Sequence, residues 1–267
     1  MKGKDKALVL MGDGINCEFE TAHALRLAGF NPELIHVSRL IEDPSALDHC
    51  SFLVLPGGFS FGDEIESGKV LAIKLQERVR QRLEKFIASG RLVLGICNGF
   101  QALVQMGLLP ESTEDGKNTV SLLSNANHHF INTWVELTVP PASRTSNNGF
   151  FEGLTHFQLP IRHGEGRLAV PAEFKKDILG NSALVYDKDI NGSFEKIAAL
   201  KNSRGNVLGM MPHPEAFVRW THHPAWTSMK LDNPELFQKE KAGKLPEEEA
   251  PQGLRILMNA RKMTEVL

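Results

Sequence analysis

Short apolar runs alternate with helix-forming segments in the N-terminal half of the chain. We predict four buried strands from these runs, at residues 7–11, 32–37, 52–55 and 92–96. Amphipathic helices are predicted at residues 18–28 and 70–89, each followed directly by a glycine. A strand, a helix and a second strand within about 30 residues form a βαβ unit, which requires a parallel sheet with a right-handed crossover.

The C-terminal half of the chain has fewer regular patterns. Alternation predicts a strand at residues 132–139, and an apolar run predicts a final strand at residues 207–211. Beyond Trp220 the pattern gives way to His, Pro and charge, before an amphipathic segment that predicts a last helix at 253–264. We therefore expect an α/β fold, a flavodoxin-like and mostly parallel sheet flanked by helices. One domain spans residues 1–229, and residues 230–267 form a charged linker and a helix that packs on it or extends it.

A cysteine lies at the bend between the strand at 92–96 and the helix that follows it. Gly95 and Gly99 flank Cys97 and have no Cβ, which permits a tight strand-to-helix turn that projects the thiol. The positive end of the helix dipole favours thiolate at this position. The alternative is a small cysteine packed as an apolar residue, but packing alone does not require the glycine framing. We interpret Cys97 as a nucleophile.

The second candidate segment follows the last strand. Prolines on both sides of His213 restrict the backbone and hold the imidazole beyond the strand end, and Glu215 follows two residues later. Because parallel strands bring their carboxyl ends to one edge, we expect Cys97, His213 and Glu215 to form a Cys-His-acid group. An oxyanion intermediate needs two N–H donors, and Asn98 supplies one.

Gly57 and Gly58 follow the strand at 52–55. Adjacent glycines at a strand end can expose backbone N–H groups to a ligand, and Gly58 is the candidate for the second oxyanion donor. An ordinary flexible turn would have the same sequence.

Charged residues alternate with glycines at 162–167. His163, Glu165 and Arg167 reach the same side of an extended segment, and the intervening glycines leave the backbone open to close approach. A hairpin with a solvated face would have a similar pattern, so the residues alone leave both interpretations open.

Composition excludes several other functions. A net charge of −2 on 267 residues gives no polybasic surface for nucleic acid, and no apolar run approaches the roughly 18 residues of a membrane span. Three cysteines without a Cys-x-x-Cys pair suit a reducing, cytoplasmic environment. The ten histidines lack metal-ligand spacing, so we expect no metal. No Walker loop is present, so any ATP chemistry belongs to a partner.

Four segments together identify a resemblance. Residues 56–63 (Pro-Gly-Gly-Phe-Ser-Phe-Gly-Asp), 95–101 (Gly-Ile-Cys-Asn-Gly-Phe-Gln), 160–167 (Pro-Ile-Arg-His-Gly-Glu-Gly-Arg) and 212–215 (Pro-His-Pro-Glu) occur in this order. The combination resembles the class I, or triad, glutamine amidotransferases, and more narrowly the glutaminase subunits of phosphoribosylformylglycinamidine synthase. The first and third segments are generally lacking in other amidotransferases, and the resemblance extends from residue 7 to about residue 217.

The resemblance implies a role for each matching position. Cys97 is the expected nucleophile, His213 the acid and base, and Glu215 its orienting partner, with oxyanion donors at Gly58 and Asn98. Gln101 and Gly57 are expected to bind L-glutamine, and the run from His163 through Glu165 to Arg167 is expected to lie near the substrate and the synthetase interface. The expected partners are a synthetase (PurL) and a further small protein (PurS). No cofactor is expected in this chain, because ATP and Mg belong to the synthetase.

Three departures from the family pattern are visible. Residues 131–134 (Ile-Asn-Thr-Trp) stand where small subunits commonly have Cys, a basic residue and Trp, which leaves open the groups that hold the α-amino and α-carboxylate. The region after Phe217 is longer than usual and resembles the glutaminase end of the single-chain synthase. The first strand begins close to Met1, so we expect the acceptor domain in trans.

Two other classes of protein remain as alternatives. Cysteine-elbow proteins with redox or hydrolytic chemistry have a similar fold but lack Pro-His-Pro-Glu after the last strand. A non-catalytic assembly protein would have no need of an intact triad. Neither Cys17 nor Cys50 stands in an elbow, so we expect both to be dispensable for catalysis.

Overall fold

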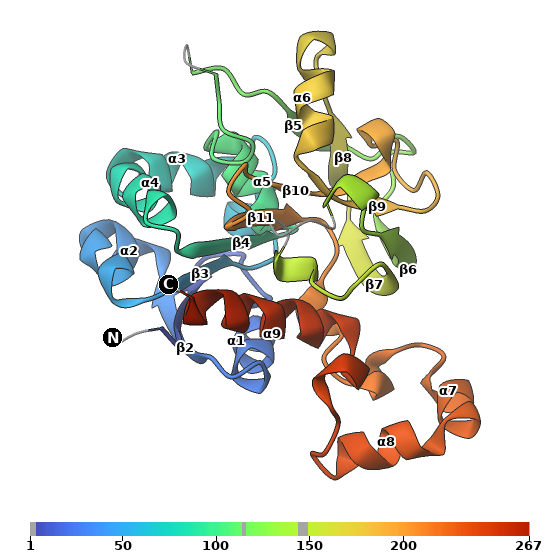
Figure 1. Ribbon diagram of the computed structural model, residues 1–267. Helices are drawn as coiled ribbons and strands as arrows, with labels where there is room; N and C mark the ends of the chain where they lie inside the picture. Colours follow the sequence, from blue (N-terminus) through green and yellow to red (C-terminus); the bar gives the residue numbers. More distant parts are fainter. Residues whose placement is uncertain (1–3, 114–115, 144–148, 267) are drawn as a thin grey trace.

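A mixed sheet forms the centre of the molecule (Figure 1). The computed structural model describes residues 4–113, 116–143 and 149–266, and within these ranges the sheet has nine strands in the order β2-β1-β3-β4-β11-β10-β9-β6-β7. The strands are β1 (Lys6–Met11), β2 (Asn31–His36), β3 (Phe52–Leu55), β4 (Leu92–Ile96), β6 (Ile131–Thr138), β7 (His156–His163), β9 (Ser182–Tyr186), β10 (Ile197–Lys201) and β11 (Val207–Met210). A separate two-stranded sheet pairs β5 (Ser121–Ser124) with β8 (Glu165–Ala169).

The sheet has a parallel half and an antiparallel half. Strands β2, β1, β3, β4 and β11 are parallel, as the apolar runs predict, because β3 and β4 are buried along their whole length between layers of helices. Strands β10, β9, β6 and β7 continue the sheet in antiparallel pairings. The predicted α/β fold with a parallel core is therefore confirmed, and the antiparallel extension adds strands β9 and β10 that the sequence patterns did not indicate.

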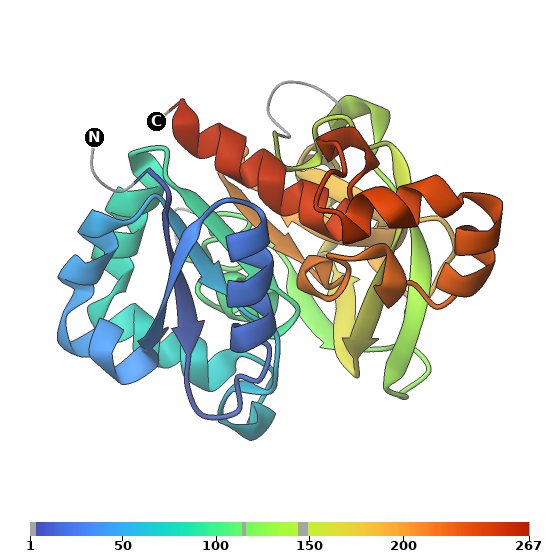
Figure 2. The same cartoon turned by 90° about the horizontal axis from the view of Figure 1, so that it is seen from below.

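Helices cover both faces of the parallel half (Figures 1 and 2). Their bounds are α1 (Glu18–Leu27), α2 (Val37–Glu42), α3 (Lys69–Arg78), α4 (Arg80–Ala88), α5 (Asn98–Gln105), α6 (Lys175–Gly180), α7 (Trp226–Asp232), α8 (Pro234–Lys241) and α9 (Gln252–Glu265). The single helix predicted at 70–89 is two helices separated at Val79. The two pieces pack on different surfaces, since α3 contacts α5 whereas α4 contacts the short 3-10 helix η1 (Pro44–His49).

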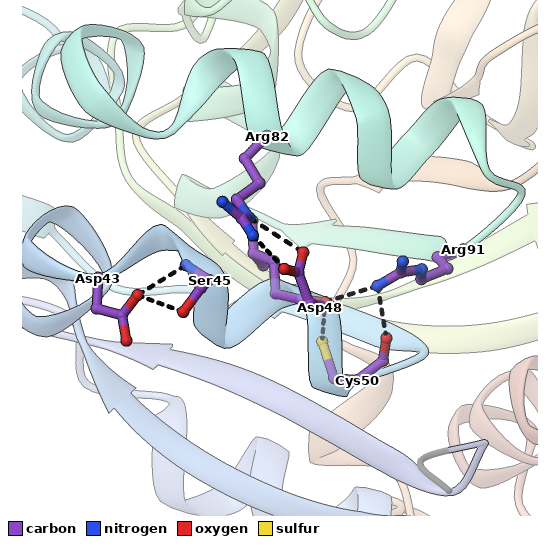
Figure 3. A network of polar contacts seen from close by, with 7 residues as sticks. Asp43, Ser45, Asp48, Cys50, Arg82 and Arg91 are labelled. Carbon is purple, nitrogen blue, oxygen red and sulfur yellow. Dashed lines mark hydrogen bonds and ion pairs between the residues drawn. The ribbon is translucent and has the colours of Figure 1, made fainter. Parts of the chain in front are cut away.

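An ion pair joins α4 to η1, and Arg91, which follows α4, contacts backbone at the end of η1 and beyond it (Figure 3). Arg82 donates two hydrogen bonds to the carboxylate of Asp48, one of them at 3.0 Å. Arg91 donates to the carbonyls of Leu47, at 2.7 Å, and Cys50, at 3.4 Å. Burial raises the pKa of the Cys50 thiol to about 12. Cys50 is thus an inert, structural thiol beneath this network.

The C-terminal segment is more ordered than the predicted charged linker. Helix α7 spans the predicted boundary between residues 229 and 230, and α8 follows it, with the Asn233 side chain capping the Leu236 N–H and the Phe237 side chain buried. These two helices form an arm beside the sheet (Figures 1 and 2). The Trp220 N–H donates to Glu240 in α8 at 2.7 Å, and its indole N–H donates at 2.9 Å to the carbonyl of Glu249, which follows α8.

Helix α9 returns from the arm and packs against the turn that follows β11. The α9 helix contacts the 3-10 turn η7 (Pro214–Ala216), and the Leu254 N–H donates to the Phe217 carbonyl at 3.2 Å. At Gly253 an added Cβ would lie 2.1 Å from the carbonyl oxygen of Pro214 and 2.5 Å from that of Phe217. Only glycine allows the helix to approach this closely, so the C-terminal helix braces the backbone between β11 and the arm.

We expect Gly253→Ala to destabilise the protein by about 2–3 kcal/mol, because two backbone carbonyls must move to admit the methyl group. Urea unfolding of the variant and the wild type measures the difference in free energy of unfolding. Gly180→Ala is the matched control, since nothing lies within 4 Å of an added Cβ there and Gly180 is part of helix α6. Equal stabilities of Gly253→Ala and wild type would contradict the brace.

Candidate active site

Cys97 lies between β4 and α5 in a strained backbone conformation, with φ of 50° and ψ of −104°. Such a conformation in a residue other than glycine costs on the order of 1–3 kcal/mol and is typical of functional sites. The flanking glycines allow this conformation because the backbone on both sides of Cys97 is closely packed. A Cβ added to Gly95 would lie 2.7 Å from the carbonyl oxygen of Gly99, and a Cβ added to Gly99 would lie 2.0 Å from the carbonyl oxygen of Leu55. Strand β11 fixes the bend from the other side, since the Cys97 N–H donates to the Met210 carbonyl at 2.7 Å.

His213 and Glu215 lie beside Cys97, at the edge where β4 and β11 end. His213 Nδ1 and Glu215 Oε1 are 2.6 Å apart, and both side chains are buried. Burial opposes a charge on His213, yet the adjacent Glu215 carboxylate and hydrogen bonding to the sulfur atoms of Cys17 and Cys97 raise its pKa well above the ordinary value. The structure therefore brings the three predicted residues together and favours the imidazolium form at neutral pH.

Cys17 is an unexpected neighbour of His213. Burial raises the pKa of its thiol to about 11, although the nearby His213 ring acts in the opposite direction. The expectation that Cys17 is dispensable rests only on its place outside an elbow. The turn after β1 nevertheless places Cys17 at the start of α1, against Gly57, whose carbonyl accepts the Cys17 N–H at 3.3 Å. Nothing in the local sequence indicates this contact, which depends on the packing of β1 beside β3.

Ligand atoms of Cys17, His213 and Glu215 all lie within 4.8 Å of one another. Two atoms that ligate one tetrahedral zinc ion are about 3.3 Å apart at bond lengths near 2.0 Å. The 2.6 Å separation of His213 and Glu215 is that of a hydrogen bond. An added Cβ on Gly57 would lie 2.8 Å from the His213 ring and 3.4 Å from the Cys17 sulfur, so Gly57 occupies the space beside them. The geometry suits proton transfer better than a metal centre.

The loop that contains Gly57 and Gly58 is held in place by the turn after β1. Gly58 has φ of 142° and pairs with Ile15, and the Phe59 N–H donates to the Gly14 carbonyl at 2.8 Å. An added Cβ on Gly58 would lie 2.8–2.9 Å from backbone atoms of residues 14–16. The loop is therefore packed and hydrogen-bonded, and the interpretation as an ordinary flexible turn does not describe it.

A chain of amide and carboxylate groups supports the start of α5. Asn98 Nδ2 donates to Asp63 at 2.8 Å and to Gln101 Oε1 at 3.1 Å, and its oxygen accepts the Ser60 N–H at 3.1 Å. Gln101 Nε2 donates to the Glu165 carbonyl at 2.7 Å. Burial raises the pKa of Asp63. Both polar ends of Gln101 are thus engaged within the protein, and Gln101 connects α5 to the segment after β7.

A cavity of about 150 Å³ opens beside Cys97. Its lining includes Gly58, Gln101, Arg162, His163 and Glu165, together with the exposed rings of Phe59 and Phe130 at its rim. The Cys97 thiol donates to the Arg162 carbonyl at 3.6 Å. Five of the predicted site residues therefore line this cavity, namely Gly58, Cys97, Gln101, His163 and Glu165, whereas Gly57, Asn98, Arg167, His213 and Glu215 do not.

The 162–167 segment is not a hairpin. It passes from β7 in the large sheet to β8 in the small sheet. His163 is only 2% exposed and lines the cavity beside Cys97, whereas Glu165 and Arg167 remain partly exposed. Arg167 donates to the Ser124 carbonyl at 2.9 Å.

Residues 131–134 are the segment that departs from the family pattern. Within it, Trp134 packs edge-on against Phe217 and so contributes to the aromatic core near the arm.

No helix in the described ranges combines the length and apolar character needed to cross a bilayer.

A family model, the CobB/CobQ-like glutamine amidotransferase domain, matches residues 4–244. A phosphoribosylformylglycinamidine synthase subunit PurQ from Dehalococcoides mccartyi is 37% identical over 239 residues, which cover 85% of this chain and 91% of that protein. The subunit of the same name from Thermotoga maritima is 39% identical over 215 residues, covering 80% and 89%.

Solved structures agree with these relatives. A chain in the structure of PurLQS from Thermotoga maritima has a TM-score of 0.66 and 35% identity, with 87% of this chain and 97% of that chain covered. A glutamine amidotransferase from Thermotoga maritima has a TM-score of 0.54 at 17% identity, over 97% of this chain and 98% of that one, and shows the fold alone. The extent of these matches and the geometry around Cys97 lead to one conclusion: the chain belongs to the CobB/CobQ-like glutamine amidotransferases and, among them, to the PurQ subunits of phosphoribosylformylglycinamidine synthase.

Proposed function

We propose that this chain is a glutaminase subunit that hydrolyses L-glutamine and passes the ammonia to a synthetase. The observation that carries the proposal is the strained Cys97 beside the buried His213–Glu215 pair at the wall of a small cavity. A nucleophile, a proton carrier and an orienting carboxylate are the parts that covalent amide hydrolysis requires.

The reaction has two stages. The Cys97 sulfur attacks the carboxamide carbon, His213 gives a proton to the departing nitrogen, and ammonia leaves a γ-glutamyl thioester. His213 then takes a proton from water, which attacks the thioester and releases glutamate. The N–H groups of Gly58 and Asn98 stabilise the oxyanion of each tetrahedral intermediate, and the packed loop around Gly58 holds its donor in advance of substrate binding. We also assign Gly57 and Gln101 to the glutamine site, and for Gln101 its place in the lining of the cavity supports this.

The ammonia acceptor belongs to a partner. We assign that role to a PurL synthetase that uses ATP and Mg to convert formylglycinamide ribonucleotide to the amidine, with PurS as a further component. Names of relatives support this assignment, because they are subunits of that synthase and one solved relative is in a PurLQS assembly. We place the protein in the cytoplasm, where its three free cysteines remain reduced.

Glu165 is the proposed connection between the site and the synthetase. Its carbonyl accepts from Gln101 at 2.7 Å, its carboxylate accepts from the Ser67 N–H at 3.3 Å, and it lines the cavity while staying partly exposed. A partner that binds near Glu165 therefore acts on α5 and on the cavity together. Arg167, which is also partly exposed, extends the same surface.

We expect the isolated chain to be a poor glutaminase that the synthetase and its ligands stimulate by about 10²-fold, the effect of aligning the Asn98 donor, which Gln101 connects to Glu165. Glutamate release, with and without saturating synthetase, measures the stimulation. Glu165→Ala should reduce it about tenfold, whereas Glu173→Ala, at an exposed position in the 3-10 helix Ala172–Phe174, should not. Equal rates for the free chain and the complex would rule out the coupling, and an undetectable rate in both would refute the glutaminase function.

A further inference from the structure

Asn125 and His163 form a buried pair beside the active site that the mechanism above does not use. Asn125 Nδ2 donates to the backbone carbonyls of His129 and His163, each at 2.8 Å, so the nitrogen end of the amide is identified by two acceptors. Its oxygen must then face His163 Nδ1, 3.0 Å away. The Asn125 N–H also donates to the Gly164 carbonyl at 2.9 Å, so this residue holds the whole turn after β7.

This orientation determines the tautomer of His163. An amide oxygen can only accept, so Nδ1 carries the proton and Nε2 presents a bare lone pair. Burial, with the charge of His213 acting in the same direction, lowers the pKa of His163 to about 4, so the ring is neutral at physiological pH. Within the described residues Nε2 is buried and has no hydrogen-bond partner. A buried polar atom of this kind is rare in folded proteins and points to a missing donor.

The position of His163 indicates which donor is missing. His163 lines the same cavity as Cys97, and the residue before it accepts the Cys97 thiol through its carbonyl. The residues that line the cavity range from Phe59 and Phe130, which are 46% and 53% exposed, to His163, which is 2% exposed. The reacting group of a substrate lies at the nucleophile, so its α-ammonium group lies towards the rim. A carboxamide NH₂ held at Cys97 is therefore the substrate donor on the His163 side of the cavity.

We propose that His163 Nε2 accepts an N–H of the substrate carboxamide and that Asn125 positions it for this task, an inference that rests on the proposed glutaminase function. The bond holds the nitrogen with its developing lone pair towards His213. During acylation the C–N bond breaks, the proton comes from His213, and His163 gains and loses none. An imidazolium at this position would have no lone pair to offer, so the low proton affinity of His163 fits the role. His163 thereby helps to select an amide over an ester or an acid.

The test compares two substrates with the chain in its synthetase complex: glutamine, and the γ-methyl ester of glutamate, which has no N–H on its leaving group. We expect His163→Leu to lower kcat/KM for glutamine about 10²-fold and for the ester less than threefold. His163→Gln should recover most of the glutamine activity, because its amide oxygen can reach the position of Nε2. Equal losses on both substrates, or no loss on glutamine, overturn the proposal. Wild-type protein that hydrolyses neither substrate refutes the glutaminase function itself.

A second measurement leaves His163 unchanged, in case the buried substitution prevents folding. In Cys97→Ala protein labelled with ¹⁵N-histidine, glutamine should shift the Nε2 resonance of His163, and the γ-methyl ester should leave it in place. The same shift with both ligands, or with neither, overturns the proposal. Alkylation of Cys97 by a glutamine-like chloromethyl ketone, which has no carboxamide, should proceed at the wild-type rate in His163→Leu. A slowed alkylation would show a structural role for His163 and also overturns the proposal.

Discussion

Cys97→Ala should abolish glutamine-dependent synthesis, with a loss of about 10⁴-fold or more, and leave ammonia-dependent synthesis by the synthetase largely intact. Removing the sulfur removes the cavity-lining thiol that we assign to form the γ-glutamyl thioester, whereas ammonia from solution reaches the synthetase without that intermediate. Product formation by the complex with glutamine or with ammonium chloride as the nitrogen source measures both activities. Substantial glutamine turnover by the variant would refute the assignment of the nucleophile.

The two remaining cysteines are no longer equivalent controls. Cys50→Ala tests a buried thiol beneath the Arg82 and Arg91 network, away from the cavity, and we expect wild-type kinetics (Figure 3). Cys17→Ala changes a neighbour of His213, a contact that its place outside an elbow does not reveal. Its sulfur contributes to the raised pKa of His213, so the substitution is a probe of the triad and should not serve as a neutral control.

The parallel half of the fold and the triad were predictable because each depends on a local pattern. Strand β4 is a continuous apolar run, and the glycines around Cys97 are required by contacts that a Cβ would block. The parallel arrangement then places the ends of β4 and β11 side by side, as their register shows. The chemistry at this edge follows from two short motifs and one rule of sheet geometry.

The remaining parts of the site depend on contacts between distant segments. Asn125 contacts His163 across 38 positions, and neither residue stands in a pattern that identifies its partner. The closeness of Cys17 to His213 likewise arises only when the turn after β1 packs on the loop after β3. The arm was missed because α7 and α8 are short and mostly exposed, so they lack a long apolar stripe.

These distant contacts have a common result, which is to fix the groups around Cys97 from several elements. Helix α9 approaches η7 through Gly253, and strand β7 accepts the His213 N–H through the Pro160 carbonyl at 2.9 Å. A network from Asp63 to Glu165 holds the first turn of α5. The proposed catalytic residues come from two short loops, and the precision of their placement depends on these surrounding contacts.

Replacing His213 should be more damaging than replacing Glu215. In His213→Asn the proton carrier is absent while a donor for the buried Glu215 remains, and we expect thioester formation to fall by about 10⁴-fold. Glu215→Gln keeps the imidazole but loses the charge that supports its protonated form, so it should retain at least about tenfold more activity than His213→Asn. Single-turnover formation of the thioester, followed by rapid quench, measures both rates. Faster acylation in His213→Asn than in Glu215→Gln would contradict the roles given to the two residues.

The pH dependence separates orientation from charge. Glu215 raises the pKa of His213, so its neutral replacement lowers that pKa and the imidazolium is lost at a lower pH. Ammonia departure needs this proton, so the alkaline limb of the acylation profile should move to lower pH in Glu215→Gln. A loss of rate with the limb unmoved would mean that Glu215 acts only by holding the ring in place. A shifted limb would show that the buried carboxylate also sets the proton affinity on which release of ammonia depends.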